Sequence, residues 1–191
     1  MSDKSPATVM PADAQAIKLA AARLQAGELV ALPTETVYGL AARADSAEAV
    51  AQIYRAKGRP DFNPLIVHVP DLARAETIAS FEERARRLAA RFWPGPLTLV
   101  LPLRADAEIA PAVTAGLSTI ALRCPAHPVM RAVLIESGLP LAAPSANRSG
   151  GVSPTRAAHV AASLGSAVGL VIDGGTARTG SGARRSPGLR A

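Results

Sequence analysis

Short apolar runs alternate with helix-patterned segments along most of this chain, and that alternation constrains the fold more than any other feature. Ile17, Ala20 and Leu24 follow the spacing of one helix face, with Asp13 placed as an N-cap. An apolar run suited to a buried strand follows at 29–32. Because the two patterns keep interleaving downstream, the sequence predicts a layered α/β sheet rather than a helical bundle or a β-sandwich.

The remaining elements follow from the same patterns. Asp45 and Glu48 form an N-capping pattern ahead of a helix that leads into the turn at 57–60. Further helices are expected at 71–79, at 82–92, at 128–136 and, starting from Ser153 or Thr155, up to residue 164. Further strands are expected at 64–69, 97–103, 119–124, 139–143 and 168–172.

The length of 191 residues fits one domain built around one core. We expect a flexible N-terminus at 1–12, a folded domain at 13–175 and an atypical Gly/Arg-rich tail at 176–191. From residue 174 onward the sequence is dominated by Gly, Arg, Ser, Thr, Ala and Pro. Such a segment buries too little apolar area to offset the entropy of ordering it, so we expect it to be loose.

Several classes of protein and site are disfavoured. No stretch approaches the ~20 apolar residues of a membrane span, and the N-terminus lacks a secretory profile, so we expect a cytoplasmic protein that does not enter a membrane. Cys124 is the single cysteine, which leaves no intramolecular disulfide and favours a structural role. The histidines at 68, 127 and 159 lie in separate elements without ligand spacing, so no protein-bound metal is expected.

The formal charge of +6 suits anionic partners such as nucleotides or RNA. Its source weakens that inference, because eighteen of the twenty-one basic residues are arginine, a bias that genome base composition alone can produce. Aromatic residues make up only 3% of the chain, which argues against a stacking platform for single-stranded RNA.

The sequence carries no standard phosphate loop, so a bound nucleotide would need another phosphate site. Lys57 and Arg59, separated by Gly58, offer a point charge and a planar fork at a helix-to-strand turn. Asn63 could add an amide at the same rim. Taken alone, the triplet is more often a solvated basic turn.

Other polar residues gather where apolar strands end. The loop at 33–39 is polar, although its threonines could simply hydrogen-bond their own backbone. His68 alternates onto one face of an apolar strand, where a lone histidine is more often a satisfied core residue. The segment 144–151 supplies hydroxyl and amide groups suited to ribose or phosphate oxygens. Ser145 lacks the flanks of a nucleophile elbow, so serine hydrolysis is disfavoured.

Taken together, six segments resemble the YrdC-like family of threonylcarbamoyl-AMP synthases in order and spacing. They are PTETVYGL at 33–40, KGRP at 57–60, NPLIVH at 63–68, WPGPLT at 93–98, RCPAHP at 123–128 and APSAN at 143–147. The resemblance covers residues 12–175 and implies a twisted mixed sheet with flanking helices and a large electropositive concave face. It also implies synthesis of L-threonylcarbamoyladenylate from L-threonine, bicarbonate and ATP.

The resemblance further implies a site. Four positions would hold threonine: Thr36, His68, Arg123 and the backbone at Ala143. Seven would surround ATP: Lys57, Arg59, Asn63, Thr119, Ser145, Asn147 and Ser153. Lys57 and Arg59 would stabilise charge on the phosphates, helped by Mg²⁺, and the product would pass to partner proteins that modify tRNA.

The sequence departs from the family pattern after residue 175. The family continues to a Ser-Thr pair and an apolar strand, whereas residues 180–185 here read GSGARR. We expect this change to weaken substrate binding or to abolish activity. Two alternatives follow: a double-stranded RNA or tRNA-binding protein of the same fold, and a domain for carbamoyl-phosphate chemistry in hydrogenase maturation, whose additional regions this chain lacks.

Overall fold

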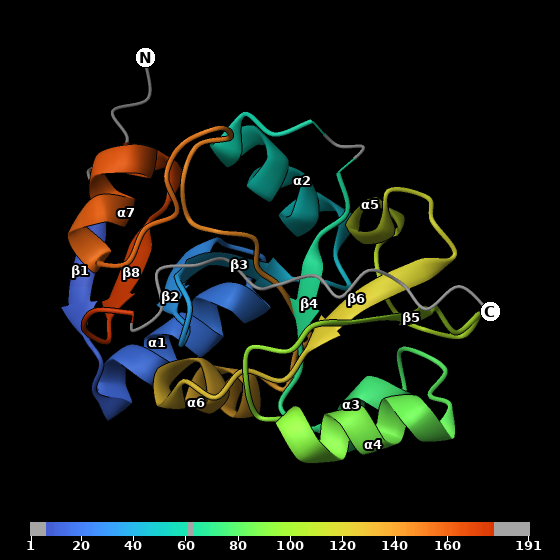
Figure 1. Ribbon diagram of the computed structural model, residues 1–191. Helices are drawn as coiled ribbons and strands as arrows, with labels where there is room; N and C mark the ends of the chain where they lie inside the picture. Colours follow the sequence, from blue (N-terminus) through green and yellow to red (C-terminus); the bar gives the residue numbers. More distant parts are fainter. Residues whose placement is uncertain (1–6, 61–62, 178–191) are drawn as a thin grey trace.

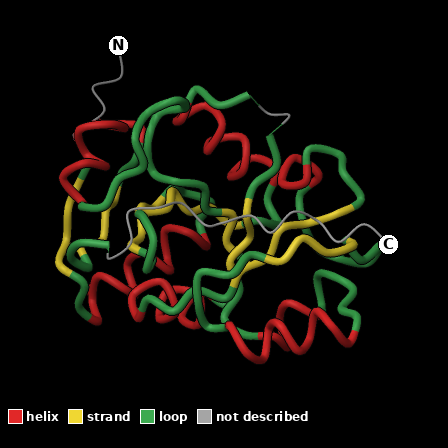
Figure 2. The backbone as a smooth tube through the Cα atoms, viewed as in Figure 1, coloured by secondary structure: helices red, strands yellow, loops and turns green. Residues whose placement is uncertain are grey.

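The computed structural model describes residues 7–60 and 63–177. These residues form one eight-stranded mixed sheet with helices packed on its two faces (Figures 1 and 2). The strands are β1 Thr8–Pro11, β2 Val30–Pro33, β3 Tyr38–Arg43, β4 Ile66–His68, β5 Leu99–Pro102, β6 Thr119–Arg123, β7 Leu141–Ala142 and β8 Leu170–Asp173. The helices are α1 Ala14–Gln25, α2 Ala47–Lys57, α3 Leu72–Glu76, α4 Glu83–Phe92, α5 Pro111–Thr114, α6 Pro128–Ser137 and α7 Ala157–Leu164. The α/β prediction is confirmed.

The strand order across the sheet is β1-β8-β2-β3-β7-β4-β6-β5. The pairs β1–β8, β2–β8 and β4–β6 are parallel, whereas β2–β3, β3–β7, β4–β7 and β5–β6 are antiparallel. Strands distant in sequence therefore become neighbours in the middle of the sheet.

The sheet separates two clusters of buried side chains, one on each face. Successive residues of a strand point to opposite faces, and the central strands follow this rule. Ala31 belongs to the cluster that also holds residues of α2 and α7, whereas Val30 and Leu32 belong to the cluster that holds residues of α1 and α6. Strands buried on both faces read as continuous apolar runs, which is why the sequence pattern located several of them.

The N-terminal segment differs from the expectation of a flexible stretch at 1–12. Within the described part, Thr8–Pro11 forms edge strand β1, which pairs with β8 in register. The amide of Thr8 donates to the carbonyl of Gly169 at 3.2 Å, and that of Ala12 to the carbonyl of Asp173 at 3.1 Å. Backbone pairing along an open sheet edge orders this segment, although its side chains are mostly exposed. Of the tail predicted at 176–191, only 176–177 is described, and there Ala177 is buried and its amide donates to the carbonyl of Thr155 at 2.9 Å. Residues 1–6 and 178–191 lie outside the described residues.

Two further local expectations were wrong or incomplete. Ser46, not Asp45, is the N-cap of α2, and its hydroxyl accepts from the amide of Ala49 at 3.2 Å. Asp45 instead pairs with the guanidinium of Arg43 at 2.7 and 2.9 Å. The sequence patterns also missed β3 and α5 entirely. Among the described residues, no helix is long and apolar enough to cross a membrane.

Candidate functional site

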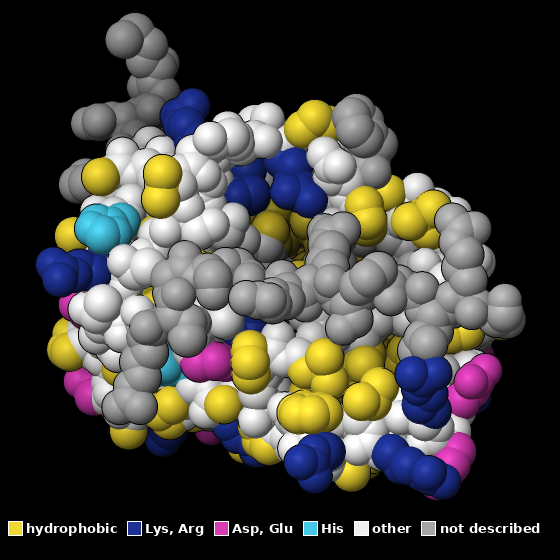
Figure 3. Space-filling model, viewed as in Figure 1, with side chains coloured by type: hydrophobic (Ala, Val, Ile, Leu, Met, Phe, Trp, Pro, Cys, Tyr) yellow, Lys and Arg dark blue, Asp and Glu magenta, His cyan; other side chains and the backbone are white. Residues whose placement is uncertain are grey.

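A cavity of about 210 Å³ brings together most of the residues predicted to bind substrates. Its lining includes the four positions expected to hold threonine: Thr36, His68, Arg123 and Ala143. It also includes three of the seven positions expected around ATP: Arg59, Ser145 and Ser153. In the space-filling view, Lys and Arg side chains gather beside a hollow in this face of the molecule (Figure 3). The electropositive character of the whole face stays a prediction.

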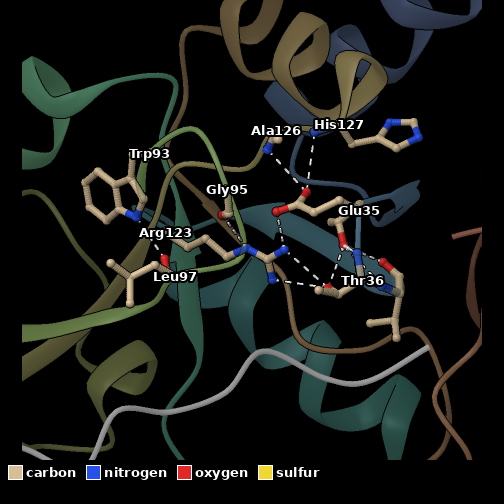
Figure 4. Close-up of polar contacts among 10 residues, drawn as sticks. Glu35, Thr36, Trp93, Gly95, Leu97, Arg123, Ala126 and His127 are labelled. Atoms are coloured by element: carbon tan, nitrogen blue, oxygen red, sulfur yellow. Dashed lines mark hydrogen bonds and ion pairs between the residues drawn. The ribbon is translucent and has the colours of Figure 1, made fainter. Parts of the chain in front are cut away.

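Arg123 is the last residue of β6, and its guanidinium is almost completely buried, with 3% of the residue exposed. Its Nε donates to the carbonyl of Gly95 at 3.3 Å, and both Nη atoms donate to Oγ1 of Thr36 at 3.2 Å (Figure 4). A Cβ at Gly95 would lie 2.4 Å from the carbonyl oxygen of Phe92, so only glycine fits this corner. The WPGP corner therefore helps to orient the arginine.

The threonines of the loop after β2 form a directed chain of hydrogen bonds. Oγ1 of Thr34 donates to the carbonyl of Val37 at 2.7 Å, which uses its only hydrogen. The 3.0 Å contact between the two threonine hydroxyls is therefore donated by Thr36. Thr34 makes the local backbone turn expected of this loop, while Thr36 accepts from Arg123.

Sequence reasoning missed Glu35, which lies between these two threonines. Its Oε1 pairs with Nη2 of Arg123 at 2.5 Å, and its Oε2 accepts from the amides of Ala126 and His127 at 3.2 and 3.4 Å (Figure 4). The signal was a single carboxylate inside a polar loop that leaves an apolar strand. Nothing in that spacing identified its partner, because Arg123 lies 88 residues away in sequence.

His68 is buried at the end of β4, with 2% of the residue exposed. Neither ring nitrogen makes a hydrogen bond of standard geometry with the described residues, although the ring interacts weakly with the backbone of Leu141. Burial, with a smaller contribution from the charge of Arg123, lowers the pKa of His68 to about 3. The ring is therefore neutral at pH 7 and presents polar atoms at the cavity.

Lys57 and Arg59 occupy different environments. Arg59 lines the cavity, and its Nη2 donates to the carbonyl of Pro64 at 3.4 Å. Lys57 is 3% exposed and does not line that cavity, because its ammonium donates to the carbonyls of Ser145 and Asn147. Burial, followed by repulsion from Arg59, lowers the pKa of Lys57 to about 8.

The other three predicted ATP residues do not line the main cavity. The amide of Asn147 donates to the carbonyls of Arg148 and Gly151 at 2.7 and 2.8 Å, so it shapes the loop after β7. The backbone carbonyl of Asn63 accepts from the hydroxyl of Tyr54 at 2.9 Å. Thr119 lines a second cavity of about 140 Å³, which shares Pro64 with the first.

No cluster of three or more His, Cys, Asp or Glu side chains within 7–60 and 63–177 could hold a metal ion. The thiol of Cys124 is buried and donates to the carbonyl of Pro70 at 3.1 Å. Burial raises the pKa of this thiol. A buried, protonated thiol fits the structural role expected for Cys124.

Comparison with known proteins identifies a family model and several relatives that match this chain. The family model for Sua5, YciO and YrdC, described as "Telomere recombination", matches residues 22–183. Threonylcarbamoyl-AMP synthase of Bacillus subtilis is 54% identical over 160 residues, which is 83% of this chain and 46% of that protein. Threonylcarbamoyl-AMP synthase of Pyrococcus abyssi is 50% identical over 166 residues, or 86% of this chain and 48% of the relative.

A solved structure gives the same result. The crystal structure of P. abyssi Sua5 complexed with L-threonine superposes with a TM-score of 0.89 at 44% identity, covering 92% of this chain and 53% of that one. The chain thus spans about half the length of these relatives. The names favour the synthase expectation over the RNA-binding alternative. Sequence, fold and the matched residues together show that the chain belongs to the Sua5/YciO/YrdC family.

Proposed function

We propose that this protein is an L-threonylcarbamoyladenylate synthase, which joins L-threonine, bicarbonate and ATP and releases pyrophosphate. The observation that carries the proposal is one cavity lined both by Arg123, Thr36 and His68 and by Arg59, Ser145 and Ser153. The first group suits a small amino acid and the second suits phosphate and ribose oxygens. Two relatives named threonylcarbamoyl-AMP synthase and a neighbour complexed with L-threonine support the same reaction.

The amino-acid end is built for a carboxylate. A guanidinium with 3% of its residue exposed attracts an anion more strongly than a solvated one, because little water screens its charge. The Thr36 hydroxyl lies within hydrogen-bonding distance of the same guanidinium. The neutral ring of His68 offers a further donor and acceptor for the threonine hydroxyl or amine.

The nucleotide end would position ATP for attack at its α-phosphorus. The threonine amine first captures carbon dioxide derived from bicarbonate, giving a carbamate. A carbamate oxygen then forms a bond to the α-phosphorus as the bond to the pyrophosphate oxygen breaks. Arg59 would stabilise the charge that develops on the phosphates, and the hydroxyls of Ser145 and Ser153 would orient them.

Mg²⁺ would enter with ATP as part of the substrate. The cavity lining contains no carboxylate, and the described residues hold no metal-ligating cluster, so the phosphates themselves would supply most of the ion's ligands. Among the described residues, the lining also contains no general base, since the pKa of His68 is about 3. Positioning and electrostatic stabilisation would therefore supply most of the rate enhancement.

We assign Lys57 a positioning role rather than direct contact with phosphate. Its ammonium holds the carbonyls of Ser145 and Asn147, and Ser145 lines the cavity. Through this loop Lys57 would place the Ser145 hydroxyl against the nucleotide. The product would then pass, in the cytoplasm, to partner proteins that attach the threonylcarbamoyl group to tRNA.

Pyrophosphate release by the purified protein tests the proposal. The assay contains ATP, Mg²⁺ and bicarbonate, with and without L-threonine, and Arg59→Ala serves as the cavity variant. We expect release that depends on L-threonine and falls at least about a hundred-fold in Arg59→Ala. Release that is equal with and without threonine, or equal in both proteins, would count against the synthase.

A further inference from the structure

The carboxylate of Glu35 joins three parts of the chain from outside the cavity. It reaches Arg123 at the end of β6 through Oε1, and the amides of Ala126 and His127 just before α6 through Oε2. Only 20% of the Glu35 side chain is exposed, and the residue is not part of the cavity lining. In the close-up, Glu35 lies between Arg123 and the backbone of 126–127 (Figure 4).

The contact with Glu35 uses one of the N–H hydrogens of Arg123 and so determines which hydrogens remain for a ligand. A guanidinium has five of them. Nε uses its hydrogen on Gly95, each Nη uses one on Thr36, and the second hydrogen of Nη2 goes to Glu35. Within the described part of the chain, the second hydrogen of Nη1 is the one left for a ligand, on the edge of the guanidinium opposite Glu35.

We propose that Glu35 is a positioning residue for substrate recognition, which rests on the proposed synthase function. By binding Nη2, it fixes the rotation of the guanidinium so that the remaining N–H of Nη1 faces the carboxylate of the amino-acid substrate. It also offsets the cost of burying the arginine charge before substrate arrives.

The position of Glu35 also shows that it does not compete with the substrate carboxylate for Arg123. A competitor would occupy the cavity and leave when substrate binds. Glu35 lies outside the cavity lining, and its Oε2 is held by two backbone amides that would lose their acceptor if it left. Glu35 therefore stays in place when the carboxylate binds.

Substitution to glutamine isolates the effect of the carboxylate. Glu35→Gln keeps the shape but has one NH₂ group, which faces either the Arg123 donors or the backbone amides. In either orientation, the NH₂ group of the glutamine faces another N–H donor, so one of the two contacts is lost. Glu35→Asp keeps the charge but is one methylene shorter, so it should preserve part of the contact.

Calorimetric titrations of L-threonine and of ATP into wild type, Glu35→Gln and Glu35→Asp test the proposal. We expect Glu35→Gln to weaken L-threonine binding about ten-fold or more while ATP affinity changes less than about two-fold. Glu35→Asp should fall between wild type and Glu35→Gln. In the pyrophosphate assay, Glu35→Gln should raise the KM for L-threonine with little change in kcat.

Glu83→Gln is the matched control, because Glu83 forms an exposed ion pair with Arg87 and neither residue lines the cavity. Unchanged or tighter L-threonine binding by Glu35→Gln would overturn the proposal, the tighter binding pointing to a competing carboxylate. Equal losses of affinity for L-threonine and for ATP would also overturn it, because they would indicate general damage to the fold. If Glu35→Gln fails to fold, unchanged threonine affinity in Glu35→Asp would overturn the proposal instead. A wild type that binds no L-threonine would refute the proposed function itself.

Discussion

Arg123 and His68, two buried residues of the proposed threonine site, differ in charge. The charge of Arg123 is paired with that of Glu35, whose Oε1 lies 2.5 Å from Nη2. Among the described residues no side chain hydrogen-bonds to His68, which lies in register with Arg123 across β4 and β6. Burial of the ring next to a cation disfavours protonation, so the site contains one fixed charge and one neutral ring.

The lowered pKa of His68 predicts how stability changes with pH. In the unfolded chain a histidine titrates near pH 6.5, whereas in the folded protein the pKa of His68 is about 3. Between these values the unfolded chain binds a proton that the folded protein does not, so stability falls as pH decreases below about 6.5. We expect wild type to lose about 2 kcal/mol more than His68→Gln between pH 8 and pH 5.

Urea denaturation at several pH values measures this difference. The matched control is His159→Gln, which replaces a histidine at an exposed position. Parallel pH profiles for wild type and His68→Gln would show that His68 has the same pKa in the folded and unfolded states, against this prediction.

At the scale of elements, the connection after β7 depends on the end of α2. Lys57 is the last residue of α2, and its ammonium holds two carbonyls of this connection. Lys57→Met leaves those carbonyls without their donor, at about 1–3 kcal/mol for each buried group. We expect the free energy of unfolding to fall by about 2–4 kcal/mol, and ATP binding to weaken with it.

Arg59→Ala provides the contrast, because Arg59 lines the cavity and is only partly buried. It should weaken ATP binding with a smaller loss of stability than Lys57→Met. Denaturant titration and ATP calorimetry on both variants separate the two roles. A Lys57→Met protein as stable as wild type would contradict the positioning role of Lys57.

The elements differ in how well local sequence predicted them. Asp13 caps α1 as expected, with its carboxylate accepting from Ala16 at 2.8 Å, because capping depends on residues three positions apart. β3 was missed because YGLAAR is rich in residues with low strand propensity. It is a strand because β2 and β7 pair with it on either side, which no local pattern reveals.

The candidate site likewise contains residues that the sequence predicted and contacts that it did not. Motif resemblance named eleven positions, and seven of them line one cavity: Thr36, Arg59, His68, Arg123, Ala143, Ser145 and Ser153. It did not predict that Lys57 would point at backbone carbonyls or that Glu35 would engage Arg123. Residue type and order specify which groups are present, whereas side-chain direction depends on packing between distant elements.

For the whole molecule, one sheet supports the two buried clusters, so they should unfold together. Leu134 lies in the cluster with α1 and α6, and Ile53 lies in the cluster with α2 and α7. Both side chains are fully buried, so we expect Leu134→Ala and Ile53→Ala each to cost about 2–5 kcal/mol. Each variant should still show one transition, with tryptophan fluorescence and circular dichroism coinciding.

Ile135→Ala is the matched control on α6, since Ile135 is 65% exposed and directly follows Leu134. It should change stability by less than about 0.5 kcal/mol. Two separate transitions in Ile53→Ala or Leu134→Ala would show that the faces of the sheet unfold independently.

Ligand binding should stabilise the molecule as a unit, because the cavity draws residues from the loop after β2, from β4 and β6, and from the connection between β7 and α7. A ligand that binds only the folded protein adds about 2.7 kcal/mol at a hundred times its Kd. We therefore expect saturating L-threonine to raise the melting temperature of a single transition and to slow amide hydrogen exchange in β3, β4, β6 and β7 together. The enantiomer D-threonine, used as the control ligand, should do neither. Protection confined to one strand would show that the ligand contacts a local surface, and that the halves of the sheet are not linked through the cavity.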